Sequence, residues 1–174
     1  MQIRSAETAG FCFGVERAVS LAEQTAKSCA SAVTLGPIIH NRHVVERFEA
    51  MGLREIARAE DAQPGQTVVI RAHGIPVSEQ QTLAARGAKL VDATCPFVKK
   101  IHVIARQAEE AGRHLLIIGT PTHPEVTAIA SYSSDAHVFQ TAQALESWLT
   151  EAPGRRDLPF CMVSQTTGTQ KLWE

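Results

Sequence analysis

Amphipathic stretches and short apolar runs alternate along the chain. Apolar residues three and four positions apart, as between Val15 and Ala26, predict helices with one buried face. Short runs rich in Val, Ile and Leu predict buried strands. The predicted helices are 14–30, 41–51, 76–86, 96–111, 124–131 and 142–150, and the predicted strands are 2–6, 32–35, 67–71, 89–92, 114–119, 136–139 and 160–164.

This order of elements predicts an α/β fold built from βαβ-type units with mostly parallel sheets. The tract 152–159 carries two prolines, a glycine and two arginines, so we interpret it as a surface loop.

A spacing of 83 residues relates two parts of the chain and predicts two similar α/β units. The matching pairs are Cys12 and Cys95, Gly36 and Gly119, and His40 and His123. We therefore expect an N-terminal strand and turn at 1–12, a first unit at 13–95 and a second unit at 96–174.

Chemically versatile side chains follow the predicted strands at their carboxyl ends, where open α/β sheets place ligand sites. Each has an ordinary structural explanation, such as a buried thiol or an acidic side chain in a first helical turn. Because polar side chains follow so many of the predicted strands, we expect these side chains to form one site. Its candidate residues are Cys12, His40, His73, Cys95, His123, Glu125, Thr166 and Thr167.

The other cysteines and histidines fit structural explanations. We interpret Cys29 and Cys161 as small packing residues of a helix and a strand. We interpret the remaining histidines as surface or capping residues, namely His43, His102, His114 and His137.

Composition excludes several classes of function. With 17 basic and 18 acidic side chains the formal net charge is −1, which gives no basic surface for nucleic acid. No apolar run reaches membrane length and residues 1–10 lack a secretory apolar region, so we expect a cytoplasmic protein with reduced thiols. Glycine-rich nucleotide fingerprints are absent from the sequence.

Six motifs, in order along almost the whole chain, carry a specific resemblance. They are GFCFGV at 10–15, IHN at 39–41, RAHG at 71–74, DATCP at 92–96, HPEV at 123–126 and SQTT at 164–167. In these motifs the chain resembles the 4-hydroxy-3-methylbut-2-enyl diphosphate reductases, the terminal enzymes of the methylerythritol phosphate route to isoprenoids.

The resemblance implies three similar α/β units around a central [4Fe–4S] cluster, with Cys12 and Cys95 among its ligands. It implies that His40, His73 and His123 hold the substrate diphosphate. Glu125 would donate a proton, and Thr166 and Thr167 would line the substrate pocket and proton relay. The implied reaction converts an allylic diphosphate to isopentenyl and dimethylallyl diphosphate, with electrons from a donor protein of ferredoxin or flavodoxin type.

The chain departs from the family pattern because the third unit and the third cluster cysteine are absent from its 174 residues. One further step of 83 residues from Cys95 falls at position 178, so we expect the third ligand beyond Glu174 and interpret the chain as an N-terminal portion. Two alternatives stay open. One is a remnant that binds a diphosphate without redox chemistry, and the other is a zinc-dependent hydrolase using Cys12, Cys95, a histidine and Glu125 as base.

Overall fold

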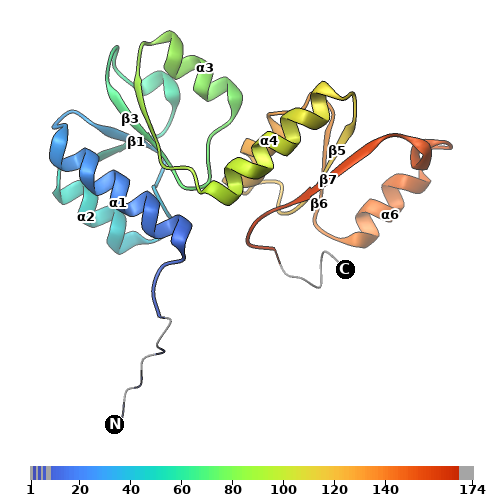
Figure 1. Cartoon of the computed structure of the whole chain (residues 1–174), viewed down its shortest axis with the longest axis horizontal. Helices are drawn as coiled ribbons and strands as arrows, with labels where there is room; N and C mark the ends of the chain where they lie inside the picture. Colours follow the sequence, from blue (N-terminus) through green and yellow to red (C-terminus); the bar gives the residue numbers. More distant parts are fainter. Residues whose placement is uncertain (1, 3, 5, 7–8, 169–174) are drawn as a thin grey trace.

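The computed structural model describes residues 2, 4, 6 and 9–168, whose helices and strands form two α/β groups (Figure 1). The first group contains α1 (Phe13–Ser28), β1 (Val33–Leu35), α2 (Arg42–Ala50), β2 (Arg54–Ile56), η1 (Ala59–Asp61), β3 (Thr67–Ile70), α3 (Val77–Ala85) and β4 (Lys89–Asp92). The second group contains α4 (Pro96–Glu110), β5 (His114–Ile118), α5 (Pro124–Ala130), β6 (Ala136–Phe139), α6 (Ala142–Thr150), η2 (Arg155–Asp157) and β7 (Phe160–Ser164).

Both sheets are parallel and share one connectivity. The first sheet has the strand order β2-β1-β3-β4, and the second has the order β6-β5-β7. In each group the first strand lies in the middle, the second strand pairs with one of its edges and the third pairs with the other. The path α1–β1–α2–β2–β3 therefore recurs as α4–β5–α5–β6–β7, while the unit boundaries at 13–95 and 96–174 stay a prediction.

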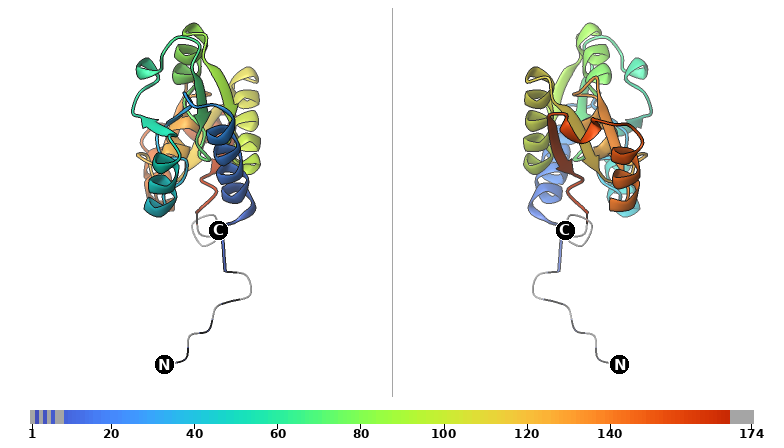
Figure 2. Two further views of the ribbon diagram at one scale, coloured as in Figure 1. Left: turned by 90° about the vertical axis from the view of Figure 1, so that its left-hand side faces the viewer. Right: turned by 90° about the vertical axis from the view of Figure 1, so that its right-hand side faces the viewer.

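Helices cover both faces of each sheet, which explains why the central strands are continuous apolar runs. In the first group α1 and α2 pack on one face, and η1 and α3 pack on the other. In the second group α4 and α5 cover one face, while Leu145 and Trp148 of α6 pack on the other. Seen end-on, helices flank the strands in both groups (Figure 2). None of the helices in the described part of the chain is long and apolar enough to cross a membrane.

The α/β class and most predicted elements are confirmed. The strands at 89–92, 136–139 and 160–164 and the helix at 142–150 have the predicted bounds, and the other matched elements differ by one or two residues at their ends. The sequence pattern missed β2, an edge strand that pairs only with β1 and exposes Arg54 and Glu55. Charged side chains protect such an edge but remove the apolar signal. The strand predicted at 2–6 falls largely outside the described residues.

The interpretation of His102 as a surface or capping residue is wrong. Its side chain is buried, with 7% of its surface exposed. Val98, His102 and Ala105 lie on one face of α4 at helical spacing, so the histidine belongs to the buried face. His43 is exposed as predicted, whereas His114 and His137 are half-buried and both contact the carboxylate of Asp135.

The central strand β5 should dominate the stability of the second group. Ile117 has 0% exposure, so Ile117→Ala leaves a cavity and should lower the free energy of unfolding by about 2 to 5 kcal/mol. Met162→Ala in β7 is the matched control. Met162 is 43% exposed, and its loss should cost about 0.5 kcal/mol or less. Urea unfolding followed by circular dichroism measures both values, and equal losses would contradict this account of the core.

Candidate functional site

Three histidines from both groups meet where the loops leave β1, β3 and β5. The ring centroids of His40 and His73 lie 4.6 Å apart, those of His73 and His123 lie 5.4 Å apart, and those of His40 and His123 lie 5.9 Å apart. One ring nitrogen from each histidine lies within 4.8 Å of the others. We call these three residues the histidine cluster. Because His123 belongs to the second group, the cluster spans the junction between the groups.

Local backbone structure sets the position of each histidine. His40 precedes Asn41, whose side-chain oxygen caps α2 by accepting a hydrogen bond from the Val44 N–H at 3.3 Å. His123 is itself the N-cap of α5, and its Nδ1 accepts from the Glu125 N–H at 3.2 Å. When His123 is neutral, this bond leaves the ring proton on Nε2, which is therefore available as a donor to a ligand.

Two histidines of the cluster, His73 and His123, favour the neutral imidazole. Burial lowers the pKa of His73 to about 4, with further lowering from His40, His123 and Arg71. Burial also lowers the pKa of His123, although the Glu125 carboxylate acts in the opposite direction. The Nδ1 atom of His73 is buried and has no hydrogen-bond partner among the described residues. A bound anion would supply both the missing partner and a compensating charge.

Arg71 adds a positive charge beside the cluster. Its Nε donates to the Gly74 carbonyl at 3.1 Å, and no carboxylate of the described residues lies within ion-pair distance of it. Its side chain lies against Gly36, where an added Cβ would come within 2.4 Å of Nη1. The positive φ of Gly36, +69°, also favours glycine there. Sequence reasoning did not single out Arg71, although a cation directly after a buried strand was a usable signal.

Glu125 is buried beside the histidine cluster, with 1% of its surface exposed. Its Oε1 accepts from the Thr166 N–H at 2.6 Å, and its Oε2 lies 2.8 Å from the Thr166 hydroxyl. Gln165 donates to the Thr167 hydroxyl at 2.8 Å, and its Oε1 accepts from the Thr120 N–H at 3.1 Å. The loops after β5 and β7 therefore bring three of the predicted residues together: Glu125, Thr166 and Thr167.

Cys12 and Cys95 occupy equivalent places, as the N-cap residues of α1 and α4, and neither thiol is used in a capping hydrogen bond. The Cys95 thiol lies against the first turn of α1, because a Cβ added at Gly14 would be 2.4 Å from its Sγ. Both thiols therefore lie at the start of α1, although 83 residues separate them. Helix N-termini stabilise thiolates, which are the form that binds metals.

The two remaining cysteines do not join this site. Cys29 ends α1, and its thiol contacts the Thr67 hydroxyl at 3.5 Å. Cys161 lies inside β7 and packs against the buried cluster of the second group. Their interpretation as packing residues is consistent with these positions.

Titration of His73 should show the effect of burial directly. Its imidazole should stay neutral until the pH falls to about 4. An unfolded histidine takes up its proton near pH 6.5, so the free energy of unfolding should fall as the pH drops from about 6.5 to about 4. Nuclear magnetic resonance titration of the imidazole and urea unfolding across this range measure both effects. His73→Gln should weaken the pH dependence, and a His73 midpoint of 6 or above would contradict the prediction.

Several curated relatives match nearly all of the chain. It is 42% identical over 169 residues to the 4-hydroxy-3-methylbut-2-enyl diphosphate reductase of Nitratidesulfovibrio vulgaris strain Miyazaki F, covering 96% of this chain and 59% of the relative. It is 34% identical over 175 residues to the reductase of the same name from Clostridioides difficile strain 630, covering 99% of this chain and 61% of that relative. The chain thus spans about 60% of the length of these curated relatives.

Solved structures match the fold over a similar share. A structure of (E)-4-hydroxy-3-methyl-but-2-enyl diphosphate reductase aligns with a TM-score of 0.79 and 37% identity, covering 97% of this chain and 59% of the other. The structure of the E-1-hydroxy-2-methyl-but-2-enyl-4-diphosphate reductase from Plasmodium falciparum aligns with a TM-score of 0.86 and 25% identity. This alignment covers 96% of this chain and 52% of the other. The family model described as LytB protein matches residues 3–174. The chain therefore belongs to the LytB protein family.

Proposed function

We propose that this chain supplies part of the active site that reduces 4-hydroxy-3-methylbut-2-enyl diphosphate to isopentenyl and dimethylallyl diphosphate. The observation that supports it most is the histidine cluster at the junction of the two groups, beside a buried carboxyl group, together with the thiols of the two N-cap residues Cys12 and Cys95. The names of the relatives and the resemblance of the six motifs favour the same reaction.

The residues present fit part of the ligand set of a [4Fe–4S] cluster. Cys12 and Cys95 offer thiols that no capping bond uses, and Gly14 provides the space in which the Cys95 sulfur lies. Thiolates are the usual ligands of such clusters. When bound, the cluster would supply the two electrons of the reduction and a Lewis-acidic iron for the allylic hydroxyl. A third cysteine ligand beyond residue 174, and an electron donor of ferredoxin or flavodoxin type, stay predictions.

The histidine cluster would hold the diphosphate of the substrate. Each neutral imidazole donates one hydrogen bond, and His73 and His123 become stronger donors when a bound anion raises their depressed pKa values. Arg71 contributes a positive charge that a bound diphosphate would attract. Binding should therefore increase the proton occupancy of His73 and His123.

Glu125 and the two threonines would deliver the proton. Thr166 contacts both carboxyl oxygens, one through its N–H and one through its hydroxyl, so it fixes the orientation of the carboxyl plane. A hydroxyl can donate to a carboxylate or accept from a carboxylic acid, which makes Thr166 suitable for a relay. Thr167 accepts a hydrogen bond from Gln165 and would add a second hydroxyl to this relay. Burial of Glu125 keeps bulk water away from its carboxyl group.

One specific observation favours the second candidate, a diphosphate-binding module without redox chemistry. The three histidines are all present and in contact within the described residues, so anion binding needs no metal and no further chain segment. The zinc-hydrolase alternative has less support. In the part of the chain that the structure describes, no group of three close metal-binding side chains includes Cys12 or Cys95.

The role proposed for Cys95 predicts its effect on iron loading. After anaerobic reconstitution of the protein expressed from the gene's complete reading frame, Cys95→Ser should retain little of the iron and sulfide bound by the parent protein. The control variant Cys161→Ser replaces a half-buried thiol of β7 and should retain all of the bound iron and sulfide. Metal and sulfide analysis with visible absorption measures the difference. A parent protein that stays colourless would refute the redox proposal and leave the diphosphate-binding module.

The role proposed for Glu125 predicts a loss of turnover with little change in substrate affinity. Glu125→Gln keeps the size of the side chain but removes the acid, so kcat should fall by about a hundredfold or more. Substrate affinity should change little, because the histidine cluster holds the diphosphate. Glu110→Gln, at the exposed end of α4, is the control and should match the parent. Unchanged kcat in Glu125→Gln would refute the assigned role.

A further inference from the structure

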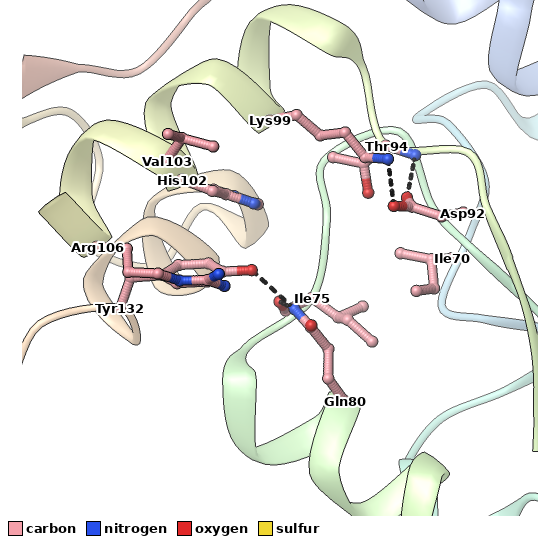
Figure 3. Close-up of a pocket in the computed structure, with 10 residues that line it drawn as sticks. All are labelled: Ile70, Ile75, Gln80, Asp92, Thr94, Lys99, His102, Val103, Arg106 and Tyr132. Atoms are coloured by element: carbon pink, nitrogen blue, oxygen red, sulfur yellow. Dashed lines mark hydrogen bonds and ion pairs between the residues drawn. The ribbon is translucent and has the colours of Figure 1, made fainter. Parts of the chain in front are cut away.

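A cavity with both polar and apolar lining lies between the two groups, apart from the histidine cluster. It has a volume of about 190 Å³ and is drawn in Figure 3. The first group lines it with Ile75 and Gln80, α4 lines it with Lys99, His102 and Arg106, and the segment after α5 contributes Tyr132. This size suits a small ligand, since drug-sized sites are usually larger.

His102 is the observation that points to a ligand. The residue is more than nine-tenths buried, and its Nε2 has no hydrogen-bond partner among the described residues. The ring is held by stacking on Tyr132, with centroids 4.7 Å apart and planes at 29°. Figure 3 shows the ring reaching from α4 into the space between Lys99 and Tyr132. A buried nitrogen without a partner is costly, and a polar ligand in the cavity would satisfy it.

The other polar groups of the cavity are mainly donors. The Tyr132 oxygen accepts from Gln80 Nε2 at 2.9 Å, so its own hydrogen is left without an acceptor in the described residues. The Arg106 guanidinium lies 5.2 Å from the Tyr132 ring centroid and has no carboxylate partner among the residues described. Lys99 pairs with Asp92, whose other oxygen accepts from the Thr94 N–H at 2.9 Å. One cationic charge and at least two donor groups therefore remain for a ligand.

We propose that this cavity binds a small organic carboxylate. The cationic side chains of Lys99 and Arg106 and the anionic side chain of Asp92 together give the cavity a net charge of +1. This charge matches a monoanion better than a phosphate dianion. The Tyr132 hydroxyl and the Arg106 guanidinium would bind the carboxylate oxygens, and one of these oxygens would accept the missing hydrogen bond from His102 Nε2. Ile70, Ile75 and Val103 supply apolar parts of the lining, which suit the carbon part of such an acid.

Occupation of the cavity would act on the histidine cluster through Gly74. A Cβ added at Gly74 would lie 2.6 Å from His102 Cε1, so the ring rests on the backbone next to His73. The bond from Gln80 to Tyr132 and the bond from the Val77 N–H to the Ser131 hydroxyl, 3.0 Å long, already join the two groups around the cavity. A bound carboxylate would add contacts to α4 and Tyr132, and so fix the junction that the histidines share.

Isobutyrate is a suitable probe, because it combines one carboxylate with a compact apolar body. Titration of the chain at neutral pH and constant ionic strength should shift the imidazole resonances of His102 and saturate. Arg106→Gln and Tyr132→Phe should each weaken binding by about tenfold, the effect of one hydrogen bond to a charged group. Lys100→Gln, exposed on the same helix but outside the cavity, should bind isobutyrate as the parent does.

Inorganic phosphate and a His123→Ala variant separate this cavity from the histidine cluster. His123→Ala should weaken phosphate binding and leave the isobutyrate shift of His102 unchanged. The proposal is overturned if the His102 shift does not saturate, if Arg106→Gln and Tyr132→Phe both bind isobutyrate as the parent does, or if phosphate competes for the cavity more tightly than isobutyrate.

Discussion

Backbone hydrogen bonds that continue past the carboxyl ends of the strands hold the candidate site in place. In the first group the Ala72 N–H donates to the Ile38 carbonyl at 3.1 Å, and the Cys95 N–H donates to the Ala72 carbonyl at 2.9 Å. These bonds extend the pairing of β1, β3 and β4 into the loops that carry His40, His73 and Cys95. In the second group the Gln165 N–H donates to the Ile118 carbonyl at 2.9 Å and fixes the loop after β7. Backbone hydrogen bonds that continue the sheets therefore fix the positions of side chains on separate loops.

Hydrogen bonds from Gln80 to Tyr132 and from Val77 to Ser131 cross the junction between the groups, whereas each group has its own apolar core. α4 begins directly after the loop from β4, and Arg17 of α1 donates to the Thr94 carbonyl in that loop at 3.2 Å. The histidine cluster and the cavity around His102 lie at this junction and draw residues from both groups. Small changes in the angle between the groups would therefore alter both sites together, while each core stays intact.

Most of the fold could be predicted from sequence because the sheets are parallel and covered on both faces. Such strands are apolar runs, and their helices show a clear buried face, as in β5 and α4. The edge strand β2 was not predictable in this way, because the charges of Arg54 and Glu55 remove the apolar signal. The burial of His102 was predictable, because the predicted helix 96–111 already places it on one face with Val98 and Ala105, and its polarity led to the wrong interpretation.

The candidate site was predictable as a set of residues but not as a geometry. Strand ends indicated where His40, His73, His123 and Glu125 belong, and the sheets bring them together. The pairing of Glu125 with Thr166 depends on the register of β5 and β7, and the approach of Cys95 to α1 depends on the packing of two helices. Neither of these two contacts produces a periodic pattern in the sequence. The chemical roles of these residues remain predictions.

The close approach of Cys95 to Gly14 has a consequence for the order of events during maturation. The Cys95 thiol reaches the start of α1 only after the loop after β4 has docked there, and closing such a long loop in an unfolded chain is entropically unfavourable. The iron affinity proposed for these thiols would then be a property of the native state, so metal loading would follow folding and would stabilise its product by mass action. A nascent chain would present isolated thiols to its surroundings, which limits premature capture of metal and unwanted cross-linking until the protein has folded.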